Sequence, residues 1–471
     1  MKAYTKLAKN SFLFALGSVG SKGISFLMLP LYTRFLTTGE YGEIDVFLTT
    51  ILLLTPLITV QASEAVFRFS MDENKSHSAT LVNALFLCFS GFLVLLLLAP
   101  LLTRMAFFSE HAFVFYLVLL SAIVDNVLKQ FTRGIGRIKH FISSDILYAI
   151  VFATSNVVLI CILNWKINGY LYSLLCAHFF SIVFLVFFCG AGQYFSFRSF
   201  DFSLLKLMVK YSIPLIPTAI MWWVMNVSNR YFISYFLGFE ATGIYAVACK
   251  IPVILTTANI IFFQAWQISA IEGYGTPDFK NIFYNVFRML SLSMIIFTSL
   301  ILLMLKPLFA VMVTADFFVA WKYVPILLLG VIFSTLSSFW GVIYVASKKT
   351  TGALITSGAG ALMNICLNIL LIPIIGIHGA LISTVIAYLV MWVVRYLHIR
   401  KINMVHIEVV GFLKGLFLIV VQIYIILNIY NPQISYFLQV CVLGIIVLSG
   451  RNILMKSLNL IVPNVRTRFF G

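Results

Sequence analysis

The sequence predicts an all-α protein that crosses a membrane many times. Of its 471 residues, 62% are hydrophobic and only 10% are charged, whereas soluble domains carry about 25% charged residues. Apolar runs of about 20 residues, the length that spans a bilayer as a helix, recur along the chain, and strand-like alternation is absent. This composition excludes a water-soluble enzyme, a disordered protein and a disulfide scaffold.

Fourteen apolar runs are long enough to be membrane-spanning helices. In chain order they are 11–31, 44–66, 81–102, 113–131, 141–163, 167–191, 209–238, 243–266, 286–313, 322–346, 351–373, 377–396, 407–430 and 433–455. The first follows three lysines but has no clear small-residue cleavage site, so we expect a retained helix rather than a signal peptide.

The charge distribution predicts the orientation. The chain has 32 Lys and Arg against 15 Asp and Glu, a net charge of +17; 24 of the basic residues fall at one set of helix ends and 5 at the other. By the positive-inside rule, both termini are expected in the cytoplasm. Topology therefore explains the basic charge, and we expect no nucleic-acid partner.

The connecting segments predict a protein that is not an enzyme. No outer loop exceeds about 15 residues, which leaves no room for a soluble catalytic domain. The seven cysteines lie in apolar segments without a C-x-x-C pair, and there is no phosphate-binding glycine loop. We therefore expect no metal, no disulfide and no cofactor.

An internal repeat predicts two related halves. Short motifs recur at an offset of 201 residues, and six helices per half would give both halves the same orientation, a design that commonly encloses a central cavity with alternating access. We predict a lobe over 1–200, a second lobe over 201–402, and an additional helix pair with a basic tail over 403–471. Two motifs match at this offset: Lys9–Ser11 with Lys210–Ser212, and Phe35–Leu36 and Gly42 with Phe236–Leu237 and Gly243. A third, Asn168–Leu171 with His378–Leu381, matches at an offset of 210.

Lys22 is the first candidate for a binding residue. It lies eleven residues beyond Ser11, about 16 Å along a helix, and a cation at that depth costs about 2.5–3.5 kcal/mol unless it faces a cavity. Ser18 and Ser25 share its face at helical spacing. We expect this stripe to face a cavity; a structural ion pair is the alternative.

Arg230 and Lys250 are further candidates at similar depth. Arg230 shares a helical stripe with Trp222 and Asn226, near the outer end of the segment 209–238, and Lys250 lies about two turns into the next segment. Each fits either a substrate contact or an interfacial anchor. Trp222 fits either stacking on a sugar ring or core packing.

The acidic residues predict an anionic cargo, because none is an isolated charge at mid-membrane. Glu64 with Arg68 and Asp125 with Lys129 have the spacing of local ion pairs. Asp145 lies in the first turn of its helix, where a carboxylate is favourable. The unpaired buried charge is thus predicted to be positive.

Two groups of short motifs lie far apart in the sequence. They are Lys9–Ser11, Leu29–Leu36 and Glu40–Gly42 near the start, and Asn364–Asn368, Ile372–Pro373, Gly376 and Gly379–Leu381 in the second half. These motifs resemble those of bacterial polysaccharide repeat-unit flippases, which transport O-antigen or capsule units, and the chain is accordingly identified as a member of the multidrug/oligosaccharidyl-lipid/polysaccharide exporter superfamily. The resemblance implies a location in the bacterial plasma membrane. The resemblance implies a V-shaped bundle of two lobes and the export of undecaprenyl-pyrophosphate-linked oligosaccharide. The implied partners are this lipid-linked substrate, membrane lipids and other polysaccharide assembly proteins.

A cationic passage suits that cargo. Its anionic headgroup must cross about 30 Å of hydrocarbon, and each negative charge that moves outward gains about 2.3 kcal/mol per 100 mV of membrane potential. We therefore expect Lys22, Arg230 and Lys250 to contact the pyrophosphate. The alternatives are a multidrug/cation antiporter, for which Asp125 would be the coupling acid, a lipid II flippase and, less readily, an integral-membrane polysaccharide polymerase.

Overall fold

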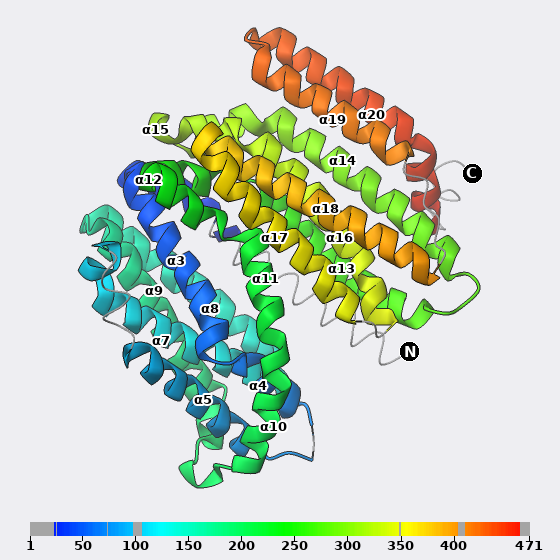
Figure 1. Cartoon of the computed structure of the whole chain (residues 1–471). Coiled ribbons are helices and arrows are strands. Elements are labelled where there is room, and N and C mark those ends of the chain that lie inside the picture. Colours follow the sequence, from blue (N-terminus) through cyan, green and yellow to red (C-terminus); the bar gives the residue numbers. More distant parts are fainter. Residues whose placement is uncertain are drawn as a thin grey trace, which may run out of the picture. The chain divides into compact units, whose positions relative to one another are not determined.

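The fold is a set of long helices (Figure 1). In this computed structural model the described residues are 23–24, 26–72, 74–97, 106–347, 350–403 and 410–461, and within these ranges no strand occurs. The chain divides into two compact units, Met1–Val247 and Ala248–Gly471. The expected all-α architecture is confirmed.

The first unit packs α7, α8 and α9 against one another and places α3 and α4 beside them (Figure 1). Its long helices are α2 (Leu29–Phe35), α3 (Thr38–Ile58), α4 (Ala62–Ser70), α5 (His77–Leu97), α7 (Ala106–Gly134), α8 (Ile138–Asn156), α9 (Lys166–Val183), α10 (Phe202–Ser212), α11 (Ile216–Asn226) and α12 (Asn229–Ala248). Short π-helical and 3-10 segments follow α8, α9 and α10: η1 (Val157–Ile162), η2 (Phe184–Phe188), η3 (Ala191–Tyr194), η4 (Phe197–Ser199) and η5 (Ile213–Leu215).

The second unit contains a layer in which α16 packs on α13 and α18, and α18 on α17, while α14 packs beside α19 and α20 (Figure 1). Its helices are α13 (Pro252–Gly273), α14 (Phe279–Met312), α15 (Ala315–Phe318), η6 (Val319–Lys322), α16 (Val324–Ala346), α17 (Thr350–Ile375), α18 (Ile377–Asn403), α19 (Val410–Asn428) and α20 (Pro432–Ile461).

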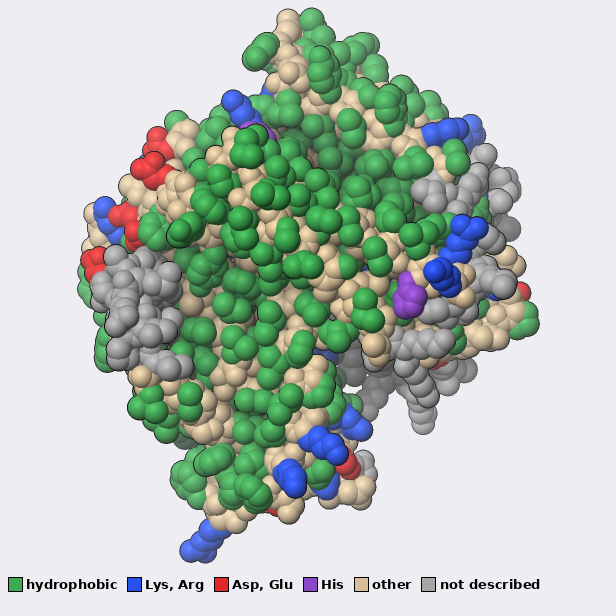
Figure 2. All heavy atoms as spheres, in the orientation of Figure 1, with side chains coloured by type: hydrophobic (Ala, Val, Ile, Leu, Met, Phe, Trp, Pro, Cys, Tyr) green, Lys and Arg blue, Asp and Glu red, His purple; other side chains and the backbone are tan. Residues whose placement is uncertain are grey.

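The helices are those of a multi-pass membrane protein. Among the described residues, twelve helical stretches are long and apolar enough to cross a bilayer, and a bent pair, α12 with the start of α13, raises the number to thirteen. The first predicted span, 11–31, lies mostly outside the described residues. Figure 2 shows hydrophobic side chains over most of the visible face, with charged side chains gathered near its edges. Such an apolar surface suits contact with lipid, and an α-helix satisfies its backbone hydrogen bonds within the same segment.

The predicted boundaries of the seventh and eighth spans are wrong. The segment 209–238 is not one helix: α11 ends at Asn226, and α12 begins at Asn229 and bends by 49° from the start of α13. The backbone ladder changes register here, because the Trp223 carbonyl accepts from both Val227 N at 2.8 Å and Ser228 N at 3.1 Å. The Val224 carbonyl accepts instead from Ser228 Oγ at 2.7 Å.

The second predicted span, 44–66, is also broken, between α3 and α4. Pro56 lacks the N–H that would continue the helical ladder, and the chain leaves the helix within five residues. Val60 and Gln61 have positive φ angles of 50° and 56°. A β-branched residue such as valine is strained there, at a cost on the order of 1–3 kcal/mol that the surrounding packing must offset.

The repeat-related glycines Gly42 and Gly243 meet where α3 crosses α12, within the first unit. A Cβ atom on Gly42 would lie 2.0 Å from the carbonyl oxygen of Phe239, and one on Gly243 would lie 1.9 Å from that of Thr38. Only glycine permits so close a crossing. The predicted lobes over 1–200 and 201–402 stay a prediction.

The chain also breaks at equivalent positions of the repeat. The Thr37 hydroxyl and the Glu40 carboxylate form a capping box that starts α3 after a break. At the position 201 residues beyond Thr37, Gly238 interrupts α12 with a φ of 84°. The same local interruption therefore recurs at the same place in both repeat copies.

Candidate functional site

A cavity of about 490 Å³ lies within the first unit, among α3, α4, α7, α9 and α11. Its polar lining comes from four of these helices, and it contains an acid and a histidine but no Lys or Arg. The lining includes Thr55, Pro56, Gln61, Glu64, Asn126, His178, Trp222 and Trp223. The described part of this cavity is therefore not the basic one that the sequence predicted.

The helix break between α3 and α4 forms one wall of this cavity, where Pro56, Gln61 and Glu64 all face it. Interrupted helices are typical of transporter binding sites, because they expose backbone polar groups at membrane depth only where protein or a water-filled cavity satisfies them. Glu64 is exposed, and among the described residues it forms no ion pair with Arg68. The predicted local pair is therefore wrong, which leaves an acid in the cavity wall.

Two adjacent tryptophans of α11 have different surroundings. Trp222 is 58% exposed and faces the cavity. Trp223 is 9% exposed, and its Nε1 donates to the backbone oxygen of Thr49 at 3.0 Å, which fastens α11 to α3. Trp222 thus offers an open aromatic face to a ligand, whereas Trp223 is structural.

A buried cluster of charges adjoins the cavity. Asp125 of α7 is 2% exposed; its carboxylate is 3.0 Å from Lys129 Nζ and 3.0 Å from His178 Nδ1, and accepts from Ser181 Oγ at 2.6 Å. The predicted Asp125–Lys129 pair is confirmed. His178 and Ser181 come from α9, more than 50 residues away in sequence, so spacing could not predict them.

Asp145 of α8 completes the cluster. Its carboxylate lies 2.9 Å from Lys129 Nζ, so one ammonium bridges two carboxylates on two helices. The ring of Tyr148, one turn further along α8, lies 4.8 Å from Lys129 Nζ and 4.8 Å from the His178 ring. The cluster thereby ties α7, α8 and α9 together inside three predicted spans.

Three of the predicted binding residues, Lys22, Ser18 and Ser25, lie outside the described residues. Arg230 is described and differs from the prediction in two ways. It belongs to α12, beyond the break, rather than to the helix of Trp222 and Asn226. Its Nε donates to the carboxylate of Asp45, so the predicted unpaired cation is in fact ion-paired.

Arg230 still lies near the other members of its predicted stripe. Its Nη1 donates to the backbone oxygen of Asn226 at 3.3 Å, and the guanidinium lies 5.7 Å from the ring of Tyr245. Asn226 is exposed, with its amide on the carbonyl of Trp222. Asp45 lies near the start of the predicted span 44–66, and the sequence did not reveal its pairing with a residue 185 positions away.

Lys250 is not two turns inside a helix, as predicted. It lies in the turn between α12 and α13, at the 49° bend, and belongs to the second unit, whereas Arg230 belongs to the first. A joint site of Lys22, Arg230 and Lys250 therefore stays a prediction.

The second unit holds a buried cation within α18. Arg395 of α18 is 7% exposed. It donates to Thr356 Oγ1 at 3.0 Å, to the Ser337 backbone oxygen at 2.8 Å and to Ser357 Oγ at 2.7 Å. All three acceptors are uncharged. The sequence signal that could have shown the burial of Arg395 was its position within the apolar segment 377–396.

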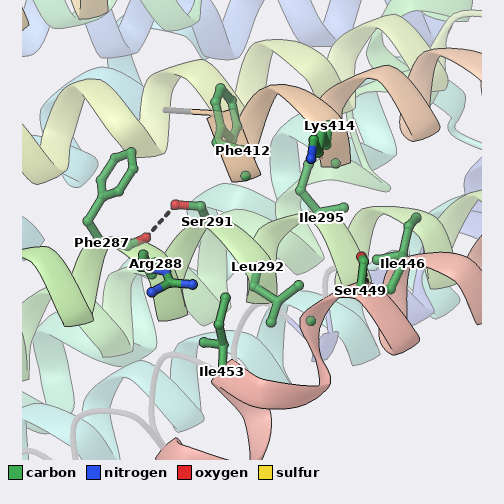
Figure 3. Close-up of a pocket in the computed structure, with 13 residues that line it drawn as sticks. Phe287, Arg288, Ser291, Leu292, Ile295, Phe412, Lys414, Ile446, Ser449 and Ile453 are labelled. Atoms are coloured by element: carbon green, nitrogen blue, oxygen red, sulfur yellow. Dashed lines mark hydrogen bonds between the residues drawn. The ribbon is translucent and has the colours of Figure 1, made fainter. Parts of the chain in front are cut away.

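A second cavity, of about 260 Å³, lies between α14, α19 and α20 of the second unit. Figure 3 shows Arg288 projecting from α14 and Lys414 from α19, with Leu292 and Ile295 between them and Ile446 beside Ser449 on α20. Its described lining contains no acid. No group of three or more His, Cys, Asp and Glu side chains is arranged to hold a metal ion in the part of the chain that the structure describes.

A family model described as "Polysaccharide biosynthesis protein" matches residues 7–268, more than half of the chain. The chain belongs to the polysaccharide biosynthesis protein family. This confirms the resemblance drawn from its motifs.

A further relative is an uncharacterised membrane protein of Methanocaldococcus jannaschii. The chain described here is 29% identical to that relative over 174 residues, which are 34% of each protein. The chain thus spans about a third of the length of the curated relative that it matches.

Solved structures show the fold that the family member adopts. A lipid II flippase, MurJ, in an inward closed conformation matches with a TM-score of 0.70 and 14% identity, over 95% of this chain and 99% of that one. An inward-facing multidrug resistance MATE transporter of the MOP superfamily matches with a TM-score of 0.66 and 14% identity, over 81% and 96%. A further MOP transporter, from Pyrococcus furiosus, matches with a TM-score of 0.59 and 14% identity, over 83% and 95%. The fold is therefore that of MOP-superfamily transporters.

Proposed function

We propose that this protein flips undecaprenyl-pyrophosphate-linked oligosaccharide repeat units across the bacterial plasma membrane, for the synthesis of surface polysaccharide such as O-antigen or capsule. The observation that carries the proposal is the family match over residues 7–268 of a multi-pass membrane protein. The fold of a lipid-linked-substrate flippase supports it. On this proposal both termini are cytoplasmic, the protein catalyses no covalent step, and other assembly proteins supply and consume the lipid-linked unit.

The cavity of the first unit supports a sugar-binding role. Sugar rings have apolar faces that stack on aromatic side chains, and hydroxyls that hydrogen-bond to polar groups. Trp222 offers the exposed ring, while Gln61, Glu64 and Asn126 contribute amide and carboxylate groups to the lining of the same cavity. A carboxylate in the lining accepts hydrogen bonds from neutral sugar hydroxyls but repels a phosphate. We therefore assign the pyrophosphate to basic residues outside this cavity.

The pyrophosphate is assigned to Lys22, Arg230 and Lys250 during alternating access. The ion pair between Arg230 and Asp45 gives this assignment a specific mechanism, since a diphosphate would replace the carboxylate as the partner of the guanidinium. Arginine suits the exchange because its planar fork binds carboxylate and phosphate oxygens in the same geometry. The Asp45 carboxylate then keeps the site occupied and neutral between transport cycles.

Deleting the gene and following the lipid-linked repeat units tests the proposal. We expect intact units to accumulate on the cytoplasmic leaflet and surface polysaccharide to disappear, and the wild-type gene to reverse both. Lys22→Glu should fail to complement while Lys22→Arg succeeds, at equal amounts of inserted protein. Unchanged surface polysaccharide in the deletion strain would reject the proposal.

A cation antiporter is the second candidate, because the buried Asp125 cluster has the composition of a cation-coupling site. This candidate predicts that the deletion raises sensitivity to cationic drugs and leaves the lipid-linked units in place. A lipid II flippase instead predicts loss of cell-wall synthesis, and hence of viability, in the deletion strain.

A further inference from the structure

The cavity between α14, α19 and α20 combines basic side chains with an apolar wall (Figure 3). Arg288 of α14 and Lys414 of α19 line it, and Leu292 and Ile295 lie between them. Arg288 is half-buried, with its guanidinium carbon 5.4 Å from the centre of the Tyr284 ring, whereas Lys414 is exposed. Among the described residues, neither cation forms an ion pair. The cavity therefore offers two positive charges that no described acid neutralises.

The composition of the three helices explains why these charges lack an acidic partner nearby. The sequences of α14, α19 and α20 contain six Lys and Arg residues and no Asp or Glu. A cation beside apolar side chains is costly unless an anion or water reaches it. The charge of the cavity thus favours an anionic ligand, and its apolar wall favours one that also carries hydrocarbon.

The depth of the cavity matches the level of lipid phosphates in a bilayer. Arg288 and Lys306 are 18 residues apart on α14, which is five helical turns, so they lie on one face about 27 Å apart. The hydrocarbon core is about 30 Å thick, so each cation lies close to one boundary of that core. The positive-inside rule assigns the Arg288 end, where Lys414 and Arg451 also lie, to the cytoplasmic leaflet. That leaflet holds anionic lipids, and basic pockets between membrane helices bind their headgroups.

The contact between α14 and α19 is closed at mid-membrane. Ser299 Oγ donates to Gln422 Oε1 at 2.6 Å, and Gln422 Nε2 donates to the Ser299 backbone oxygen at 3.0 Å, with both side chains buried. Nearer the cavity, a Cβ atom on Gly450 would lie 2.6 Å from Leu292, so α20 also lies close against α14. A lipid held in the cavity therefore cannot pass between α14 and α19 to the other leaflet. Its position is that of a resident lipid, not of cargo.

We propose that this cavity binds the headgroup of an anionic, two-chain phospholipid of the cytoplasmic leaflet, which holds the helix pair α19–α20 against α14. Arg288 holds the phosphate, because its planar fork binds two phosphate oxygens at once. Lys414 adds a second positive charge to the same cavity, and the acyl chains stay in the surrounding bilayer. The inference rests on the second unit alone and does not require the proposed cargo.

Native mass spectrometry of the full-length protein tests the site by measuring the dissociation constant of the first bound lipid. The probes are dioleoyl phosphatidylglycerol, which is anionic, and dioleoyl phosphatidylcholine, which has no net charge. We expect wild-type protein to bind phosphatidylglycerol more tightly. Each basic residue near the membrane surface contributes about fivefold to such binding, so replacing both by Arg288→Gln and Lys414→Gln should weaken it about 25-fold. Lys280→Gln, the matched control, removes an exposed charge of α14 outside the cavity and should leave it almost unchanged.

A further variant fills the cavity without changing its charge. Gly411 lines the cavity, and a Cβ atom there meets nothing within 4 Å, so Gly411→Leu should fold normally and yet weaken phosphatidylglycerol binding. Gly444 is equally open but does not line the cavity, so Gly444→Leu should bind as wild type does.

Three results would overturn the inference. The first is equal binding of the two lipids by wild-type protein, and the second is unchanged phosphatidylglycerol binding in both the Arg288/Lys414 double variant and Gly411→Leu. The third is displacement of the bound lipid by inorganic phosphate or, at equal concentration, by undecaprenyl diphosphate, because the cavity would then recognise a free anion or the cargo lipid. The proposed function is tested separately, by the surface polysaccharide of the deletion strain.

Discussion

Replacing Lys129 by methionine removes the one ammonium that bridges two carboxylates. Lys129 Nζ lies 3.0 Å from Asp125 and 2.9 Å from Asp145, and the side chains of Lys129 and Asp125 are 13% and 3% exposed. Removing one partner of a buried pair costs about 3–5 kcal/mol, because a charge stays buried without compensation. Two features put Lys129→Met near the lower limit: Asp145 is 31% exposed, and Asp125 keeps its bonds to His178 and Ser181.

The expected loss is thus about 3 kcal/mol of unfolding free energy at pH 8. The assay is reversible denaturation in mixed micelles at pH 8. Lys139→Met is the matched control, since Lys139 is exposed near the start of α8 and its loss should change the free energy by less than about 0.5 kcal/mol. Equal stability of Lys129→Met and wild type at pH 8 would refute the buried-cluster reasoning.

Three further changes give distinct expectations. Gly42→Ala should destabilise the fold by about 1–3 kcal/mol or more, because its methyl group meets the backbone of α12; Gly444→Ala, where a Cβ meets nothing within 4 Å, should be neutral in the same denaturation assay. Trp222→Ala should leave the unfolding free energy almost unchanged but reduce polysaccharide export, whereas Trp223→Ala should cost about 3–5 kcal/mol; equal effects on stability would contradict the assignment of their surroundings. Val60→Gly should stabilise the α3–α4 break by about 1 kcal/mol by relieving a positive φ, and a loss of thermal stability would argue against strain there.

Hydropathy and local spacing predicted the features that depend on single residues or neighbouring turns. The fold class, most of the spans and the Asp125–Lys129 pair follow from transfer free energies and from helical periodicity, and all three are confirmed. Gly42 and Gly243 were visible in the sequence as a repeated motif, but their close approach was not predicted.

The features that the sequence did not reveal depend on tertiary contacts or on short interruptions. Hydropathy averaged over about 20 residues cannot detect a break of two or three residues. The α3–α4 break and the ends of α11 and α12 were therefore not predicted. Arg230 and Asp45 are 185 residues apart, and Asp125 and His178 are 53 apart. A single sequence contains no signal for such pairings, which is why Arg230 was predicted to be unpaired and His178 was overlooked.

Transport by the purified, full-length protein in vesicles is the most direct measurement of function. An undecaprenyl-diphosphate-linked oligosaccharide is placed in the inner leaflet, and the sugar that reaches the outer leaflet is measured with an impermeant glycosidase. We predict that wild-type protein makes the sugar accessible far faster than protein-free vesicles do, and that Lys22→Glu does not. Accessibility no faster than in protein-free vesicles, or equal in wild type and Lys22→Glu, would contradict flipping through a phosphate-binding passage.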